Sequence, residues 1–185
     1  MTDSFGPWKR RSVSERYDNA WIRVEHHDVT TPGGNPGVYG VVHFKNIALG
    51  IIPLDDNGDT WIVGQYRYPH RAYTWEIPEG GGPVGTDPLA SAQRELVEEV
   101  GLHAARWDLI LEMDTSNSVT DERCLIYLAR ELEMHSRHPE DTEELAVRRI
   151  PFEELHRGVL RGEYRDAITI AGVLKLAHLR EHGLI

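Results

Sequence analysis

Cysteine is almost absent from this 185-residue chain, because Cys124 is the only one. A single cysteine excludes an internal disulfide and any zinc site built from several cysteines. Cys124 lies in a segment that we predict to be a strand, where it is expected to be a small core residue and not a nucleophile. Long apolar runs are also absent, and no segment reaches the ~20 residues that a membrane-spanning helix needs.

Basic residues are outnumbered by acidic ones, with 20 Lys and Arg against 30 Asp and Glu and a formal net charge of -10. This balance argues against a nucleic-acid backbone or an anionic membrane as the main partner. The first seven residues lack the basic and apolar regions of a secretory signal, so we expect a cytoplasmic protein. The ten histidines, among them His26 and His27, form no recognisable metal-ligand motif, and most are expected at the surface.

The composition is that of a globular protein, with 40% hydrophobic and 27% charged residues. The length suits one domain with a full core and a small added layer. We predict that residues 1–45 form a lobe of strands, because this segment alternates β-branched and aromatic residues around a dense turn signal at residues 32–37. Such a lobe is too small to bury a core alone, so it must pack against another part of the protein or another subunit. The strands expected here cover residues 8–17, 21–29 and 38–44.

The second predicted domain, residues 46–185, mixes strands and helices. A turn at residues 55–59 joins two of its strands; its acidic residues lack the spacing of a calcium loop. Residues 135–142 are expected to be a polar linker. Apolar residues at positions 168, 171, 174, 176 and 179 are expected to supply much of the buried face of the last helix. The predicted strands are residues 47–54, 60–67, 73–77, 108–113, 123–132 and 143–151, and the later helices begin at residues 152 and 165.

A helix from Pro88 to Val100 is the most strongly predicted element. Asp87 is a good N-cap, Pro88 suits the first helical position, and Gly101 suits a left-handed end. Leu89, Ala92, Leu96 and Val100 recur at helical spacing, so they should form its buried stripe. A glycine loop is expected before this helix.

Three glutamates, Glu95, Glu98 and Glu99, fall within a third of the circumference of this helix. Like charges at this spacing repel each other, so a positive partner is expected. Hard oxygen ligands without His or Cys suit magnesium, with manganese as the alternative, and these ions also bind phosphate oxygens. The other interpretation of the cluster is a solvated acidic helix face.

The string Arg94-Glu95-x-x-Glu98-Glu99-x-Gly101, with Gly80 fourteen residues before the arginine, resembles the signature of the Nudix hydrolases. The resemblance implies an α+β Nudix fold, in which a mixed β-sheet is sandwiched between helices, here with an N-terminal antiparallel β-sheet lobe. It implies that Glu95, Glu98 and Glu99 bind metal together with the main-chain carbonyl of Glu79, and that Arg94 orients the cluster. Thr86 stands where the family usually has a glutamate.

Two further segments resemble the ADP-ribose pyrophosphatase branch of that family, namely residues 65–69, which read Gln-Tyr-Arg-Tyr-Pro, and residues 75–80, which read Trp-Glu-Ile-Pro-Glu-Gly. The resemblance implies that Arg67 contacts the substrate with Glu76 beside it. Tyr66 and Trp75 are candidates to stack on its base, although aromatic residues in strands more often pack in a core. The N-terminal sheet of that branch is exchanged between two subunits, so the resemblance implies a homodimer. The sequence alone equally allows a lobe that folds back on its own domain.

The loop of residues 115–122 ends in Thr-Asp-Glu, as it does in the same branch. The resemblance implies that the final glutamate, here Glu122, acts near the attacking water; the other interpretation is an ordinary solvated loop residue. We therefore predict metal-dependent hydrolysis of the diphosphate in ADP-ribose or a related nucleoside diphosphate sugar, giving a nucleoside monophosphate and a sugar phosphate. The alternatives are a preference for GDP-mannose or UDP-glucose, or a Nudix-fold regulator that binds a nucleotide without turnover.

Overall fold

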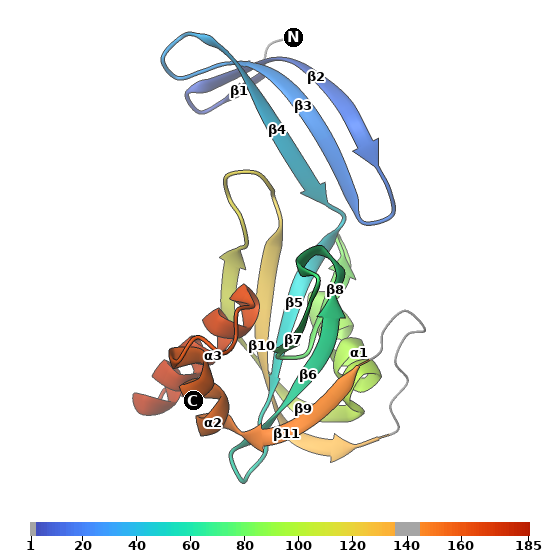
Figure 1. The fold of residues 1–185 in the computed structure, drawn as a ribbon, viewed down its shortest axis with the longest axis vertical. Helices are drawn as coiled ribbons and strands as arrows, with labels where there is room; N and C mark the ends of the chain where they lie inside the picture. The colour runs from blue at the N-terminus through green and yellow to red at the C-terminus, as the bar shows by residue number, and fades with distance from the viewer. Residues whose placement is uncertain (1–2, 136–144) are drawn as a thin grey trace. The chain divides into compact units, whose positions relative to one another are not determined.

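The computed structural model describes residues 3–135 and 145–185, which form two compact units. One unit holds the residues up to Ile47 together with Asp114–Arg123, and the other holds Ala48–Met113 and Cys124–Ile185. The division into domains 1–45 and 46–185 with separate roles stays a prediction. The elements, labelled in Figure 1, are β1 (Asp3–Phe5), β2 (Trp8–Asp18), β3 (Ile22–Thr30), β4 (Pro36–Phe44), β5 (Asn46–Pro53), β6 (Asp59–Arg67), η1 (Tyr68–His70), β7 (Ala72–Glu76), β8 (Glu79–Pro83), α1 (Pro88–Val100), β9 (Leu102–Asp114), β10 (Arg123–Met134), β11 (Ala146–Pro151), α2 (Phe152–Leu160) and α3 (Ala167–Glu181).

The first unit is built on an antiparallel sheet of order β1-β2-β3-β4, drawn in blue in Figure 1. Its three long strands match the predicted segments to within two residues, and the short β1 was not predicted. The segment Asp114–Arg123 pairs with β4, because the Val42 N–H donates to the Val119 carbonyl at 2.9 Å and the Asp121 N–H donates to the Val42 carbonyl at 3.3 Å. This segment is therefore anchored to the sheet.

The second unit contains a mixed sheet of order β8-β5-β10-β9, in which β5 and β10 are parallel, and an antiparallel sheet of order β11-β6-β7. The mixed sheet and the N-terminal antiparallel lobe confirm the predicted α+β fold. Residues 55–59 form the predicted turn, with two backbone N–H groups donating to the Asp55 carboxylate at 2.9 Å. Within the described residues, no helix is long and apolar enough to cross a membrane.

Two strands differ from the prediction. The start of the expected glycine loop is the strand β8, whose glycines let neighbouring groups approach closely; a Cβ at Gly82 would lie 2.9 Å from the Ser91 hydroxyl oxygen. The strand expected at residues 108–113 begins at Leu102, directly after α1. The polar linker expected at residues 135–142 and the first two residues of the strand expected at 143–151 fall almost entirely outside the described residues.

The core of the second unit joins both sheets to α2 and α3, and Cys124 is one of its small buried residues. The predicted buried face of α3 is partly wrong, because Leu174 is exposed. The helix instead buries a face centred on Gly172, which lies so close to β5 and β10 that a Cβ there would be 3.1 Å from Ile126. The side chains that this face buries are Thr169, Val173 and Leu176.

Candidate active site

The helix α1 positions the three glutamates, and local sequence signals determine its ends. The Leu89 N–H donates to the Asp87 carboxylate at 3.0 Å, so Asp87 is the N-cap as predicted. Gly101 ends the helix with a left-handed φ of 76°, and its N–H bonds to the carbonyls of Leu96 and Val97. The predicted helix is therefore confirmed from its first to its last residue.

The three glutamates lie at different depths. Glu99 is 2% exposed, and its Oε2 accepts the N–H of Glu79 at 3.0 Å. Glu95 is partly buried, and its Oε1 accepts the N–H of Gly81 at 3.3 Å. The Glu98 side chain is the most accessible of the three, at 27% exposure. The strand β8 thus donates backbone hydrogen bonds to the two deeper carboxylates.

Arg94 holds two of these carboxylates at once. Its Nη1 lies 2.5 Å from Glu98 Oε2, its Nη2 lies 2.7 Å from Glu95 Oε1, and Nη2 also donates to the Gly81 carbonyl at 3.3 Å. The positive partner expected for these carboxylates is therefore in part the Arg94 guanidinium, which offsets some of their repulsion.

The carboxylate oxygens of this cluster are the kind of ligand that a hard divalent cation prefers. Burial raises the pKa of Glu95, so an ionised carboxylate there is costly unless a positive charge lies nearby. A Cβ at Gly80 would lie 2.1 Å from the Glu95 carboxyl carbon, so only glycine leaves room for this carboxylate against the backbone. Within residues 3–135 and 145–185, the sets of three ligand atoms that converge within 4.8 Å do not include the α1 glutamates. Arg94 pairs with the carboxylates of Glu95 and Glu98, and a bound ion would compete with Arg94 for them.

Arg67 and Glu76 form a second polar group, on the β6–β7 hairpin. Arg67 Nη2 lies 2.6 Å from Glu76 Oε1, and Nε donates to Oε2 at 3.2 Å. Gln65 donates to the same carboxylate at 2.7 Å. The Glu76 side chain is only 2% exposed, and burial raises its pKa against the opposing effect of Arg67. A buried carboxylate thus holds the arginine in a fixed orientation.

Glu79 lies between the two groups. Its N–H bonds to Glu99, while its carboxylate lies 3.5 Å from Arg67 Nη2 and accepts the Thr169 hydroxyl at 3.4 Å. Burial raises the pKa of Glu79 well above its ordinary value, and a hydrogen bond with Asp166 adds to the shift. The side chain therefore holds a proton more readily than an ordinary glutamate. The metal contact predicted for Glu79 is through its main-chain carbonyl. The position of its side chain does not test this contact, which stays a prediction.

A cavity of about 480 Å³ opens beside Arg67 and Glu76. Two oppositely charged residues immediately before α3, Arg165 and Asp166, contribute to its wall together with Glu79. The cavity therefore offers guanidinium groups for phosphate oxygens and carboxyl groups for hydroxyls. The remaining lining residues are Pro69, His70, Ala72 and Thr74.

Tyr66 and Trp75 lie on the other face of the same hairpin. The register pairs Tyr66 with Tyr73 and Arg67 with Ala72, and alternate residues of a strand face opposite sides. Trp75 packs edge-on against Tyr73, and the Arg148 guanidinium covers its ring at 3.9 Å. The structure thus brings Arg67 and Glu76 together but separates them from Tyr66 and Trp75.

Residues 45–169 match the NUDIX domain family, and residues 8–42 match the nucleoside diphosphate sugar hydrolase N-terminal domain. The chain belongs to the Nudix family. This Nudix hydrolase is 38% identical to an ADP-ribose pyrophosphatase of Mycobacterium tuberculosis over 85% of its length and 77% of that protein. It is 30% identical to an ADP-ribose pyrophosphatase of Bacillus subtilis over 83% of both chains. A crystal structure of an ADP compounds hydrolase has the same fold, with a TM-score of 0.85 and 20% identity over 99% of this chain and 100% of that one.

Thr86 marks the one departure of this Nudix hydrolase from the signature that we quoted. Its hydroxyl and its N–H both bond to the Pro83 carbonyl, at 2.7 and 3.1 Å, so it closes the turn before α1. Arg94 has Glu95, Glu98 and the Gly81 carbonyl as its partners. The turn is therefore closed by local hydrogen bonds without the glutamate.

Glu122 belongs to the first unit, whereas the other candidate residues belong to the second. Its carboxylate accepts the Thr115 hydroxyl at 2.5 Å, and its N–H donates to the Thr120 hydroxyl at 3.0 Å. The loop around it is anchored to β4, because Tyr39 donates to the Ser118 carbonyl and Asp121 accepts the Phe44 N–H. The catalytic role of Glu122 stays a prediction.

Two residues of this site were not predicted as part of it. Gln65 stood in the motif that we quoted, but its contact with Glu76 depends on the hairpin register. Asp166 accepts the Thr169 N–H as the N-cap of α3, which its sequence context could have indicated. Its position beside Glu79, 87 residues away, carries no sequence signal.

Proposed function

We propose that this chain hydrolyses ADP-ribose at its diphosphate, releasing AMP and ribose 5-phosphate. The observation that carries the proposal is the position of Glu79, whose N–H bonds to Glu99 and whose carboxylate lies 3.5 Å from Arg67. One residue thereby joins an acidic face suited to metal ions and an arginine suited to a phosphate. The 38% identity to an ADP-ribose pyrophosphatase supports the choice of substrate.

Divalent metal would be held by the side chains of Glu95, Glu98 and Glu99 with the Glu79 carbonyl. Magnesium, or manganese in its place, supplies neutralisation of the charge on the diphosphate oxygens. Arg94 keeps the carboxylates of Glu95 and Glu98 oriented between turnovers. These contributions are electrostatic, as hydrolysis of a diphosphate requires.

Arg67 is our candidate for holding one phosphate of the substrate. Glu76 occupies one edge of the guanidinium, so the remaining N–H groups are available toward the cavity. Carboxyl groups of Glu79 and Asp166 would accept hydrogen bonds from ribose hydroxyls. This division of roles favours a sugar diphosphate over an inorganic diphosphate.

Glu122 is our candidate for the general base. Carboxylates that bind metal are poor bases, so a further carboxylate is needed to take a proton from the attacking water. The Thr115 hydroxyl bonds to one oxygen of Glu122 and helps to orient the group.

We also propose a homodimer through the first unit, supported by its exposed apolar side chains, among them Val13 and Val38. Light scattering of the full chain at micromolar concentration, with the V13D/V38D variant as comparison, tests the dimer.

A substrate panel tests the proposed function. ADP-ribose, GDP-mannose and UDP-glucose should be compared by kcat/KM with magnesium present, and the products should be identified by mass. We expect ADP-ribose to be preferred by at least about tenfold, which corresponds to about 1.4 kcal/mol of transition-state binding. A preference for either nucleotide sugar would move the assignment to that substrate, and binding without turnover of any of them would favour a regulator.

A further inference from the structure

One face of the sheet β1–β4 gathers an acid and two imidazoles that have no part in the proposed reaction. The strands β3 and β4 are antiparallel, with Glu25 opposite Val41 and Arg23 opposite His43. Residues two apart on a strand share a face, and directly opposite residues do as well. Glu25, His27 and His43 therefore lie on the same side of the sheet.

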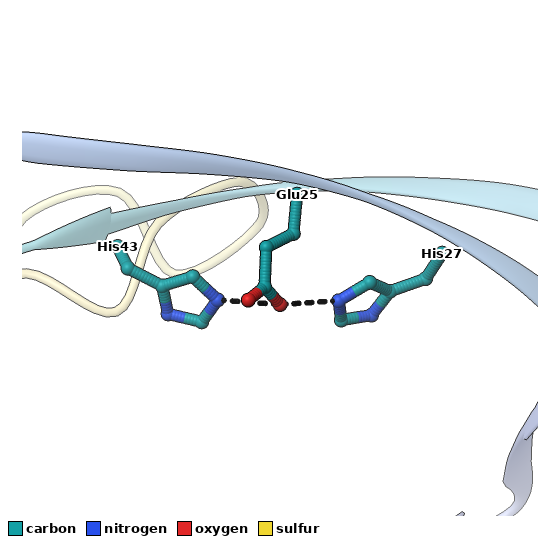
Figure 2. A group of neighbouring side chains, drawn as sticks. All are labelled: Glu25, His27 and His43. Atoms are coloured by element: carbon teal, nitrogen blue, oxygen red, sulfur yellow. Dashed lines mark hydrogen bonds and ion pairs between the residues drawn. The ribbon is translucent and has the colours of Figure 1, made fainter. Parts of the chain in front are cut away.

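The three side chains converge on one oxygen. His27 Nε2 lies 2.8 Å and His43 Nε2 lies 3.1 Å from Oε2 of Glu25, which stands between the two rings in Figure 2. One ligand atom from each residue lies within 4.8 Å of the others. The side chains are between 12% and 25% exposed, so water reaches them only in part. Such distances allow a single ion, with bonds of about 2.0–2.2 Å, to replace the two hydrogen bonds.

Asp121 fixes the orientation of one ring. Its Oδ2 lies 2.5 Å from His43 Nδ1, and a carboxylate can only accept a hydrogen bond. His43 Nδ1 therefore carries a proton. In a neutral ring Nε2 then presents a lone pair to Glu25, which is repulsive unless a proton or a cation lies between them. A carboxylate bonded to the far nitrogen of a histidine is the usual support of a histidine that binds metal.

The surroundings leave room for an ion. Arg23 pairs with the other oxygen of Glu25, Oε1, at 3.1 Å and leaves Oε2 to the imidazoles. His27 and His43 also line a cavity of about 360 Å³ with Trp8 and Tyr39. Water in this cavity can complete the coordination of an ion held by three protein ligands.

We propose that Glu25, His27 and His43 form a binding site for a divalent transition-metal ion, with Zn²⁺ as the best match. Two imidazole nitrogens and one carboxylate oxygen suit zinc, whereas magnesium demands oxygen ligands. The site is thus chemically distinct from the glutamates of α1. Because Asp121 belongs to the segment Asp114–Arg123, a bound ion would strengthen the connection of that segment to β4.

The competing arrangement is a network without metal, in which protons on both imidazoles hold Glu25 and Asp121. Zinc binding separates the two arrangements. The full chain should be titrated with Zn²⁺ by calorimetry in excess Mg²⁺, which occupies sites made of oxygen ligands alone. We expect one equivalent of Zn²⁺ to bind with Mg²⁺ present, and Co²⁺ in its place to give the visible absorption of a site with nitrogen ligands.

Four variants test the ligands. His27→Gln and His43→Gln should each abolish this zinc binding, and Asp121→Asn should weaken it by about 10–100-fold, as expected for loss of a supporting partner. His26→Gln is the matched control, because His26 lies on the same strand but on the opposite face, near Asp28. It should bind zinc as the wild type does.

The thermal melting of each variant without zinc establishes that it is folded. Zinc should raise the melting temperature of the wild type and of His26→Gln, raise that of Asp121→Asn less, and leave those of His27→Gln and His43→Gln unchanged. Equal zinc affinity in the wild type and His43→Gln would overturn the proposal. So would the absence of zinc binding by the wild type in excess Mg²⁺, which would assign the cluster to the proton-held network.

Discussion

Arg67 binds both carboxylate oxygens of Glu76, with Nη2 at 2.6 Å from Oε1 and Nε at 3.2 Å from Oε2. The acid is buried, so it holds the guanidinium in one plane, and a lysine could not make the same pair of bonds. Under our proposal, this is the face of the β6–β7 hairpin that binds the substrate.

Arg67→Lys should raise KM for ADP-ribose by about tenfold with little change in kcat, because an interaction made equally in the ground and transition states is weakened. Arg148→Lys is the control, since Arg148 covers Trp75 on the opposite face. Steady-state kinetics of the two variants check the assignment. A larger effect of Arg148→Lys would place the substrate on the Tyr66 and Trp75 face instead.

Gly80→Ala should lower kcat/KM by at least about tenfold, because the new methyl group would occupy the position of the Glu95 carboxyl group. The backbone at Gly80 does not have a positive φ, so the fold should tolerate alanine. Gly40→Ala is a suitable control, since a Cβ there meets no atom within 4 Å. Activity at the wild-type level in a folded Gly80→Ala protein would contradict the role of Glu95.

Glu122→Gln should reduce kcat by roughly two to four orders of magnitude with little change in KM, which is the range for loss of a general base. Glu133→Gln, at an exposed position near the end of β10, is the control. A decrease of less than tenfold in Glu122→Gln combined with a severe defect in Asp121→Asn would transfer the role to Asp121.

Asp55→Ala should lower the free energy of unfolding at pH 7 by about 1–2 kcal/mol, because two backbone N–H groups lose their acceptor. Burial opposes ionisation, but these hydrogen bonds and the charge of Arg149 still lower the pKa of Asp55 below its ordinary 3.8. A carboxylate with a lowered pKa stabilises the fold above its unfolded pKa and loses that effect as the pH falls. Urea denaturation should thus show a constant deficit from neutral pH to about pH 5, shrinking below about pH 4, with Asp56→Ala as the control.

The elements that could be predicted are those determined by neighbouring residues. Asp87, Pro88 and Gly101 act within one turn of α1, so its ends were evident from the sequence. The strand β8 was missed because glycine is unfavourable in strands, and its glycines are needed for close contacts with α1 that only the fold reveals.

The site was predictable to the extent that motifs cover it. The Nudix signature located Glu95, Glu98 and Glu99, but the contact of Glu79 with Asp166 joins segments 87 residues apart. Most of the histidines were expected at the surface and no metal-ligand motif was recognised among them. His27 and His43 are nevertheless partly buried around Glu25, because the register of β3 against β4 brings them together. Register and long-range packing are properties of the whole chain and leave no local pattern.

The most direct test of the account is the hydrolysis of ADP-ribose with and without Mg²⁺ by the wild type and Glu99→Gln. Glutamine keeps an oxygen that can accept the Glu79 N–H, so the fold should persist while a charged ligand is lost. We predict AMP release by the wild type only with divalent metal, and a decrease of at least about a hundredfold in Glu99→Gln, or nearly 3 kcal/mol in the barrier. Undiminished hydrolysis in excess chelator, or full activity of Glu99→Gln, would contradict the account.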